Sequence, residues 1–191
     1  MPVMSQPPKK LTYADFLLFP DDGKRHELID GVHYVTPSPR IPHQVLVGRL
    51  FVALANFLSG HRRLGRVFLS PVDVVMSDHD VVVPDLIFVA DEQRTTVTEA
   101  NVQGTPVLVV EVLSPSTRRR DEGIKRKLFD QKGAREYWLV DPENCRVSIY
   151  RRAADGSFPI VSTLSAAADE QIETPLLPGF ELSVSELFAE I

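Results

Sequence analysis

Apolar residues in the first third of the chain change from helical to strand-like spacing and back again. Residues 12–19 open with a Thr-x-x-Asp cap signature and continue into an apolar run, which predicts a short helix. Residues 25–35 alternate in polarity around the pair Asp30-Gly31, a pattern typical of a β-hairpin. Residues 43–58 then carry apolar side chains at helical spacing, which predicts a long amphipathic helix.

Short apolar runs bounded by turn residues predict strands in much of the remaining chain. The expected strands lie near residues 67–69, 72–75, 86–89, 107–113, 137–140, 147–150 and 159–162. One helix interrupts this series, from about Ser116 to Lys132, because Pro115 precedes it and Gly133 follows it. A short helix capped by Ser183 is expected near the end. Without an internal repeat, the pattern indicates one mixed α/β domain over residues 1–191.

Composition narrows the class of protein. The chain has 191 residues, of which 43% are hydrophobic and 25% charged, as is usual for one globular domain. No stretch approaches the roughly 18 apolar residues that a membrane span needs, and residues 1–10 lack the apolar centre of a secretion signal. Cys145 is the single cysteine, which excludes disulfides within one chain. We therefore expect a cytoplasmic protein without a membrane partner.

The distribution of charge matters more than its sum. A net charge of −5 argues mildly against nucleic-acid binding, because Lys and Arg make the contacts to phosphates. Basic residues nevertheless crowd one segment, and these are Arg118, Arg119, Arg120, Lys125, Arg126, Lys127, Lys132 and Arg135. Such a run is usually a solvated helix face. Its position directly after Glu111 favours a functional interpretation.

Two acidic residues in apolar surroundings are the strongest chemical signal in the sequence. Glu111 lies within the aliphatic run 107–113, where an ionised carboxylate costs several kcal/mol unless a partner meets it. Asp85 follows Pro84 at the head of another apolar run. If the two strands pair, both carboxylates can converge on a divalent ion, and oxygen ligands suit magnesium or manganese.

Simpler roles for these acids stay open. Asp85 could be a turn residue, and Glu111 could be an ion-pair partner of Arg135 or Lys125. The proposed cation partner is Lys125, because it lies four residues after Asp121 on the same helix face and can orient a water or neutralise a phosphate. An exposed Lys125 paired with Asp121 is the alternative, and Lys127 competes for the same role.

Six short motifs in order resemble a known family. They are His-Glu-Leu-Ile-Asp-Gly at 26–31, a Pro-Ser-Pro…His helix start at 37–43, Pro-Asp-Leu at 84–86, Val-Glu-Val-Leu-Ser-Pro-Ser at 110–116, Asp-x-x-x-Lys at 121–125 and Glu-Tyr-Trp-Leu-Val-Asp-Pro at 136–142. Together they resemble the Uma-two family of predicted restriction endonucleases in the PD-(D/E)XK nuclease superfamily. The likeness covers about residues 13–150 and returns at 177–182.

The resemblance implies a fold and a chemistry. The fold is α/β, with a restriction-endonuclease-like mixed sheet flanked by helices and preceded by an N-terminal helix and hairpin. The activity is magnesium-dependent cleavage of DNA, with Mn²⁺ able to substitute for Mg²⁺ and with Asp85 and Glu111 as metal ligands. The superfamily usually has its lysine two residues after the glutamate, where this chain has Leu113. Members of the family place it on the next helix, which matches Lys125, and use an early glutamate, which matches Glu27.

Further expectations complete this interpretation. His43 is expected to line the cleft, with a capping or surface role as the alternative, and Arg118, Arg119 and Lys127 are assigned to substrate binding. A homodimer would supply two cutting sites, and the aliphatic run 81–83 could pair strands between copies. The competing function is a nuclease-like domain that no longer cuts and serves in nucleic-acid binding or assembly. A different hydrolase on the same scaffold is a third possibility.

Overall fold

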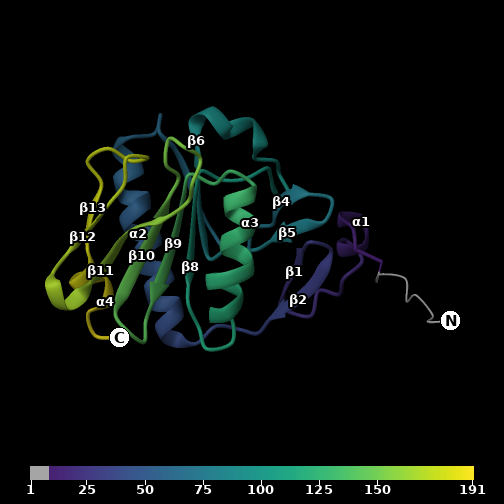
Figure 1. Ribbon diagram of the computed structural model, residues 1–191, viewed down its shortest axis with the longest axis horizontal. Helices are drawn as coiled ribbons and strands as arrows, with labels where there is room; N and C mark the ends of the chain where they lie inside the picture. Colours follow the sequence, from purple (N-terminus) through teal and green to yellow (C-terminus); the bar gives the residue numbers. More distant parts are fainter. Residues whose placement is uncertain (1–8) are drawn as a thin grey trace.

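A six-stranded mixed sheet forms the centre of the protein (Figure 1). The computed structural model describes residues 9–191. In spatial order the strands are β11 (Ile160–Ser165), β10 (Arg146–Arg151), β9 (Glu136–Asp141), β8 (Leu108–Val112), β6 (Leu86–Ala90) and β3 (Gly65–Leu69). The pair β8 and β9 is parallel, and every other neighbouring pair is antiparallel. The parallel pair requires a crossover, which the basic segment provides.

A five-stranded sheet lies beside it, toward the N-terminal end (Figure 1). Its order is β2 (Val32–Thr36), β1 (Arg25–Ile29), β5 (Asp80–Val82), β4 (Val74–Ser77) and β7 (Val102–Gln103). The hairpin of β1 and β2 turns at Asp30 and Gly31, whose φ angles of 52° and 71° confirm the expected Asp-Gly turn. A separate two-stranded sheet joins β12 (Gln171–Glu173) to β13 (Glu181–Ser183).

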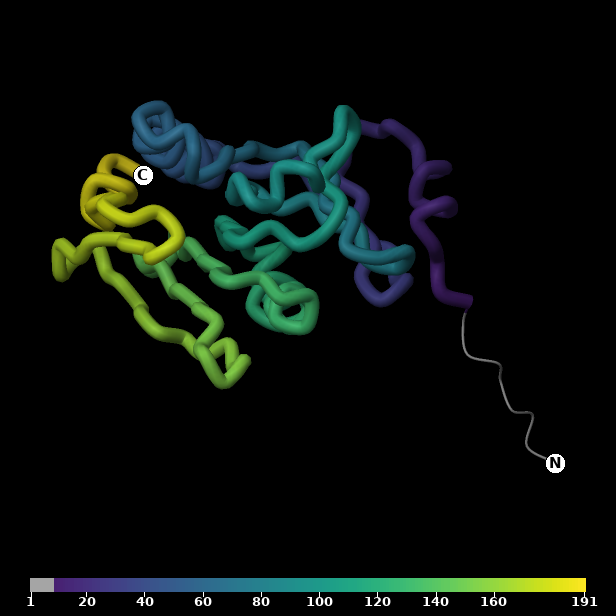
Figure 2. The backbone as a smooth tube through the Cα atoms, turned by 90° about the horizontal axis from the view of Figure 1, so that it is seen from above, coloured from purple at the N-terminus to yellow at the C-terminus, as the bar shows by residue number. Residues whose placement is uncertain are grey.

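Helices lie against both sheets. They are α1 (Tyr13–Phe16), α2 (Ile41–Gly60), α3 (Arg126–Gln131) and α4 (Val184–Phe188), with 3₁₀ turns η1 (Asp91–Thr96) and η3 (Ala166–Ala168) and a π-helical turn η2 (Arg120–Lys125). Figure 2 shows α2 on one side of the sheet and α3 on the other. Thr12 caps α1 through a capping box, and Ser183 caps α4, as their sequence signals predict.

The two faces of the sheet are buried in two separate cores, because side chains alternate along each strand. Leu86 and Phe88 of β6 belong to the core that includes the buried face of α2. Ile87 and Val89 of the same strand belong to the core that contains Leu128 and Phe129 of α3. The fully buried Trp138 confirms its expected place in the core.

Two expectations from the sequence are corrected here. The run 81–83 is not an exposed edge: Val81, Val82 and Val83 are buried, and β5 lies between β1 and β4. Helix α2, with a mean hydropathy of 1.4, is long and apolar enough to span a membrane, although no such stretch was expected. Alone, this is weak evidence for a span, because α2 buries one face against the sheet as core helices do. Burial on its inner face explains the high apolar content.

Candidate active site

The candidate catalytic residues lie around a cavity of about 250 Å³ between the two sheets and the crossover segment. Glu27 comes from β1, Asp85 immediately precedes β6, Glu111 lies on β8, and Asp121 and Lys125 lie in η2. All five residues are at most 3% exposed, so every charge among them requires a partner nearby.

Strand pairing brings the two central acids together. In the antiparallel register of β6 and β8, Leu86 lies opposite Val110, which places Asp85 beside Glu111. The Asp85 backbone N–H lies 3.4 Å from Glu111 Oε2, and the Val112 backbone N–H donates to Asp85 Oδ2 over 2.9 Å. The expected convergence of these carboxylates is therefore present.

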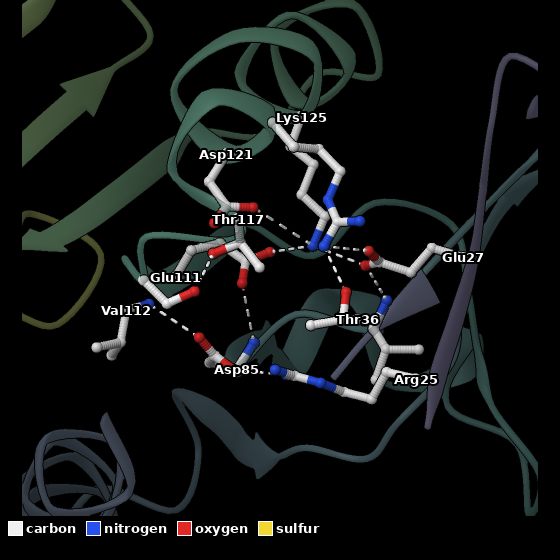
Figure 3. Close-up of polar contacts among 12 residues, drawn as sticks. Arg25, Glu27, Thr36, Asp85, Glu111, Val112, Thr117, Asp121 and Lys125 are labelled. Atoms are coloured by element: carbon white, nitrogen blue, oxygen red, sulfur yellow. Dashed lines mark hydrogen bonds and ion pairs between the residues drawn. The ribbon is translucent and has the colours of Figure 1, made fainter. Parts of the chain in front are cut away.

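Lys125 is the cation at the centre of the acidic side chains (Figure 3). Its Nζ lies 2.6 Å from Glu27 Oε1, 2.7 Å from Glu111 Oε1 and 3.9 Å from Asp121 Oδ1. Burial opposes its positive charge, but the three carboxylates outweigh that effect and raise the pKa of Lys125. Lys125 is therefore protonated at neutral pH, which suits charge neutralisation and water orientation and excludes a general-base role.

The helix that carries Lys125 is irregular at this point. A continuous helical segment runs over residues 118–131, close to the predicted range, but its η2 part has π-helical hydrogen bonding. Asp121 and Lys125, near the start and at the end of η2, are its buried residues. Single π turns are rare and are often found at functional sites. The sequence predicts the shared face of these two residues, and the wide turn directs both side chains into the cavity.

Asp85 has two basic partners of its own. Arg25 Nη1 lies 2.6 Å from Asp85 Oδ1, and His43 Nε2 lies 3.0 Å from Asp85 Oδ2. Burial raises the pKa of Asp85, but the hydrogen bond and charge of His43 and the charge of Arg25 outweigh it and lower the pKa to about 2. Asp85 is thus ionised at neutral pH, as a metal ligand must be.

Acidic and basic side chains balance in number in this cavity. The acids Glu27, Asp85, Glu111 and Asp121 face four permanent cations, which are Arg25, Arg120, Lys125 and the exposed Arg40. Burial and the neighbouring acids raise the pKa of Glu111 well above its usual value, despite the opposing charge of Lys125. Burial also raises the pKa of Asp121. Glu27 Oε2 and Asp121 Oδ1 are buried without a hydrogen-bond partner.

This donor set fits a hard divalent cation. Carboxylate oxygens are the preferred ligands of magnesium, and an added ion would favour the ionised form of Glu111, which burial disfavours. Among residues 9–191, no group of three or more His, Cys, Asp or Glu side chains is arranged to hold a metal ion. Asp85 and Glu111 would therefore hold an ion that keeps several of its waters, as magnesium commonly does.

The remaining predicted residues divide into two groups. His43 at the start of α2 is buried and lines the cavity. Arg118 does not line it, because its guanidinium pairs with Asp141 at 2.7 Å and with Glu143 at 3.0 Å. Arg119 and Lys127 are exposed and also lie outside the cavity lining. Their assignment to substrate binding stays a prediction.

Sequence reasoning missed two arginines that the structure adds to the site. Arg25 binds Asp85, and Arg120 pairs with Glu27 at 3.4 Å and donates a hydrogen bond to Thr36. A signal for Arg25 was available, because it lies two positions before Glu27 on the same face of one strand. Arg120 directly precedes Asp121, but only the wide turn makes it point at Glu27, and no spacing rule would have identified it.

Comparisons with known proteins agree with this architecture. The sequence model of the Uma2 family, described as "Putative restriction endonuclease", matches residues 13–185. An uncharacterized protein from Synechocystis sp. (strain PCC 6803) is 28% identical over 189 residues, which cover 96% of this chain and 94% of that protein. A crystal structure from Anabaena variabilis, titled as a putative nuclease belonging to DUF820, superposes with a TM-score of 0.77 at 21% identity over 93% of this chain and 97% of that chain. That likeness establishes the shared fold.

Removing the central cation should destabilise the protein strongly. We expect Lys125→Met to lower the free energy of unfolding by about 3–5 kcal/mol, because buried carboxylates lose their partner. The matched control is Lys127→Met, two residues away and exposed, which should change it by less than about 0.5 kcal/mol. Urea denaturation followed by circular dichroism measures both values, and equal effects of the two variants would contradict the central role of Lys125.

Glu111 should lower stability at neutral pH. Because its pKa is raised on folding, its stabilising contribution is complete below the unfolded value, near 4.5, and is lost as the pH rises through the folded value. Glu111→Gln should therefore raise the free energy of unfolding by roughly 1 kcal/mol at about pH 8, with Lys125 still paired to Glu27. That gain should vanish below about pH 4. A Glu111→Gln variant less stable than the wild type at both pH values would refute this assignment.

Proposed function

Because this chain belongs to the Uma2 family, we propose that it is a divalent-metal-dependent endonuclease that hydrolyses phosphodiester bonds in DNA. The observation that carries the proposal is the buried group formed by Asp85, Glu111 and Lys125, in which two carboxylates from neighbouring strands and one ammonium line the same cavity. Burial and the neighbouring acids raise the pKa of Glu111, and such shifts are common at functional sites.

Each side chain has a task that its surroundings support. Asp85 and Glu111 would hold magnesium, which when bound polarises a phosphate and lowers the pKa of a coordinated water. Lys125, held protonated by Glu27 and Glu111, would neutralise charge on the scissile phosphate or orient the attacking water. Glu27 positions Lys125, and its Oε1 also accepts a hydrogen bond of 2.9 Å from the Val83 backbone N–H.

The arginines near Asp85 suggest a second role for basic residues, which is to bind a substrate phosphate. Arg25 and Arg120 line the cavity together with Arg40 and the loop at 37–39. Guanidinium groups form paired hydrogen bonds with phosphate oxygens, so Arg25 could transfer from Asp85 to a substrate phosphate when an ion occupies Asp85. This exchange would couple ion binding to substrate binding.

One observation favours the competing function, a nuclease-like module that no longer cuts. Both carboxylate oxygens of Asp85 already have basic partners, Arg25 and His43, which an incoming metal ion would have to displace. Binding of magnesium separates the two functions, because an inactive module filled by its own ion pairs would not respond to the ion.

Nicking of supercoiled plasmid tests the proposal directly. We expect magnesium-dependent nicking by the wild type, a loss of at least about 100-fold in Asp85→Asn and in Glu111→Gln, and unchanged nicking in Arg146→Gln, an exposed position on β10 outside the cavity lining. In parallel, magnesium should raise the unfolding temperature of the wild type and not that of Glu111→Gln, by linkage. Nicking retained in both acid variants would remove the mechanism, and wild-type protein that neither binds magnesium nor nicks would support the inactive module.

Self-association is a further part of the proposal. Val81 to Val83 cannot serve it, but the outer side of α2 exposes Ile41, Val45 and Val52 around Gly48. A second copy packed along this apolar stripe would supply the second active site that a double-strand break requires. We expect a dimer by light scattering and a monomer for Val52→Asp; a monomeric wild type at high concentration would contradict this.

A further inference from the structure

A group of arginines lies at the far end of β6 from the acidic cavity. Arg62, Arg66 and Arg94, here called the arginine cluster, line a separate cavity of about 340 Å³. Asp85 precedes β6 and Ala90 ends it, so the two cavities are separated along this strand by roughly 17 Å. The arginine cluster is therefore distinct from the candidate active site.

Backbone contacts fix the three arginines relative to one another. The Leu64 N–H donates to the His61 carbonyl over 2.9 Å, and the Asp91 N–H donates to the Leu64 carbonyl over 3.0 Å, which ties the turn after α2 to the start of η1. Gly65 has a φ of 142°, and a Cβ there would lie 2.2 Å from the Val89 carbonyl oxygen. The turn therefore packs directly against β6, and Arg66 pairs in register with Val89.

No acidic side chain pairs with the arginine cluster. Within residues 9–191, none of its three side chains forms an ion pair, although Arg25, Arg118, Arg135 and Arg152 do. Glu92, next to the cavity, is paired with Arg135. Asp91 is the single acid in the lining, so the cavity carries a net positive charge in a chain whose net charge is −5.

We propose that the arginine cluster binds the phosphodiester backbone of nucleic acid at a second point, away from the cleavage site. Arg62 in the turn after α2, Arg66 on β3 and Arg94 in η1 offer guanidinium donors around one cavity, and guanidinium groups form paired hydrogen bonds with phosphate oxygens. Contacts of this kind position a nucleic acid without reading its bases. The inference rests on the proposed function for its ligand class, and it explains how an acidic chain could hold a polyanion.

Salt dependence of DNA binding tests this second contact without any cleavage. Binding of a fluorescent duplex oligonucleotide is measured by anisotropy in EDTA over a series of salt concentrations. Replacing Arg62, Arg66 and Arg94 together by Gln should reduce the slope of log K against log salt by about 2.7, since each lost phosphate contact contributes about 0.9. Arg66→Gln alone should reduce it by about 0.9. Arg146→Gln on β10, which is also an exposed strand arginine, is the matched control and should leave the slope unchanged.

Each outcome of this experiment supports or overturns the second phosphate contact. An unchanged slope in the triple variant, with its unfolding temperature equal to that of the wild type, overturns the proposal. A triple variant that loses affinity for ATP but keeps the wild-type slope for DNA also overturns it, because the arginine cluster would then be a small-phosphate site. Reduced slope in a protein that never nicks DNA would support the second contact and contradict only the nuclease activity.

Discussion

The Lys125 ammonium holds the candidate site together because it bridges carboxylates from both sheets. Glu27 belongs to β1 of the five-stranded sheet and Glu111 to β8 of the six-stranded sheet, and both lie within 2.7 Å of the same nitrogen. Arg25 and Asp85 repeat this connection with the charges reversed, since the base comes from the five-stranded sheet and the acid precedes β6. These ion pairs connect the two sheets at the cavity, beside an apolar core that Ile29, Val74 and Val82 of the five-stranded sheet share with the six-stranded sheet.

Such a junction needs support from elsewhere in the fold. Buried ion pairs seldom stabilise a protein more than apolar residues of the same size would. The raised pKa values of Glu111 and Asp121 indicate that their ionised forms are held at a cost. The two apolar cores offset that cost, because α2 and α3 bury both faces of the central sheet. Sites that trade stability for chemistry in this way are common in enzymes.

Local sequence patterns predicted most elements because each has its own signal. The alternation around Asp30 and Gly31, the apolar spacing of α2 and the cap at Ser183 are all short-range features, and all three elements are present. The pairing of Asp85 with Glu111 was also accessible, because an acid in an aliphatic strand needs a partner. The shared strand face of Arg25 and Glu27 was a signal for Arg25, but the contact of Arg120 was not accessible, because it depends on how the elements pack and no local period records that.

Local sequence patterns could not predict which strands lie at the edge of a sheet, for the same reason. The sequence of β5 alone suggests that Val81 to Val83 are exposed. In the sheet, β1 and β4 pair with the two edges of β5, and the three valines are buried. Whether an apolar run faces solvent or a neighbour is decided by the order of strands in the sheet. That order links segments more than 50 residues apart in the chain, as the pairing of Leu28 with Val81 shows.

The parallel pairing of β8 with β9 has a consequence for how the lysine can be supplied. A parallel pair obliges the chain to pass over the sheet and return, so the segment after Glu111 must cross the end of the strand on which that acid lies. A basic side chain can thus reach the same point in space from the strand or from the overlying helix. Leu113 is accordingly free to be a buried apolar residue beside Phe129 and Tyr137. In this fold the functional lysine is defined by its position above the sheet and not by its distance from Glu111 in the sequence. A motif search that requires the lysine on the strand would miss chains that carry it on the overlying helix.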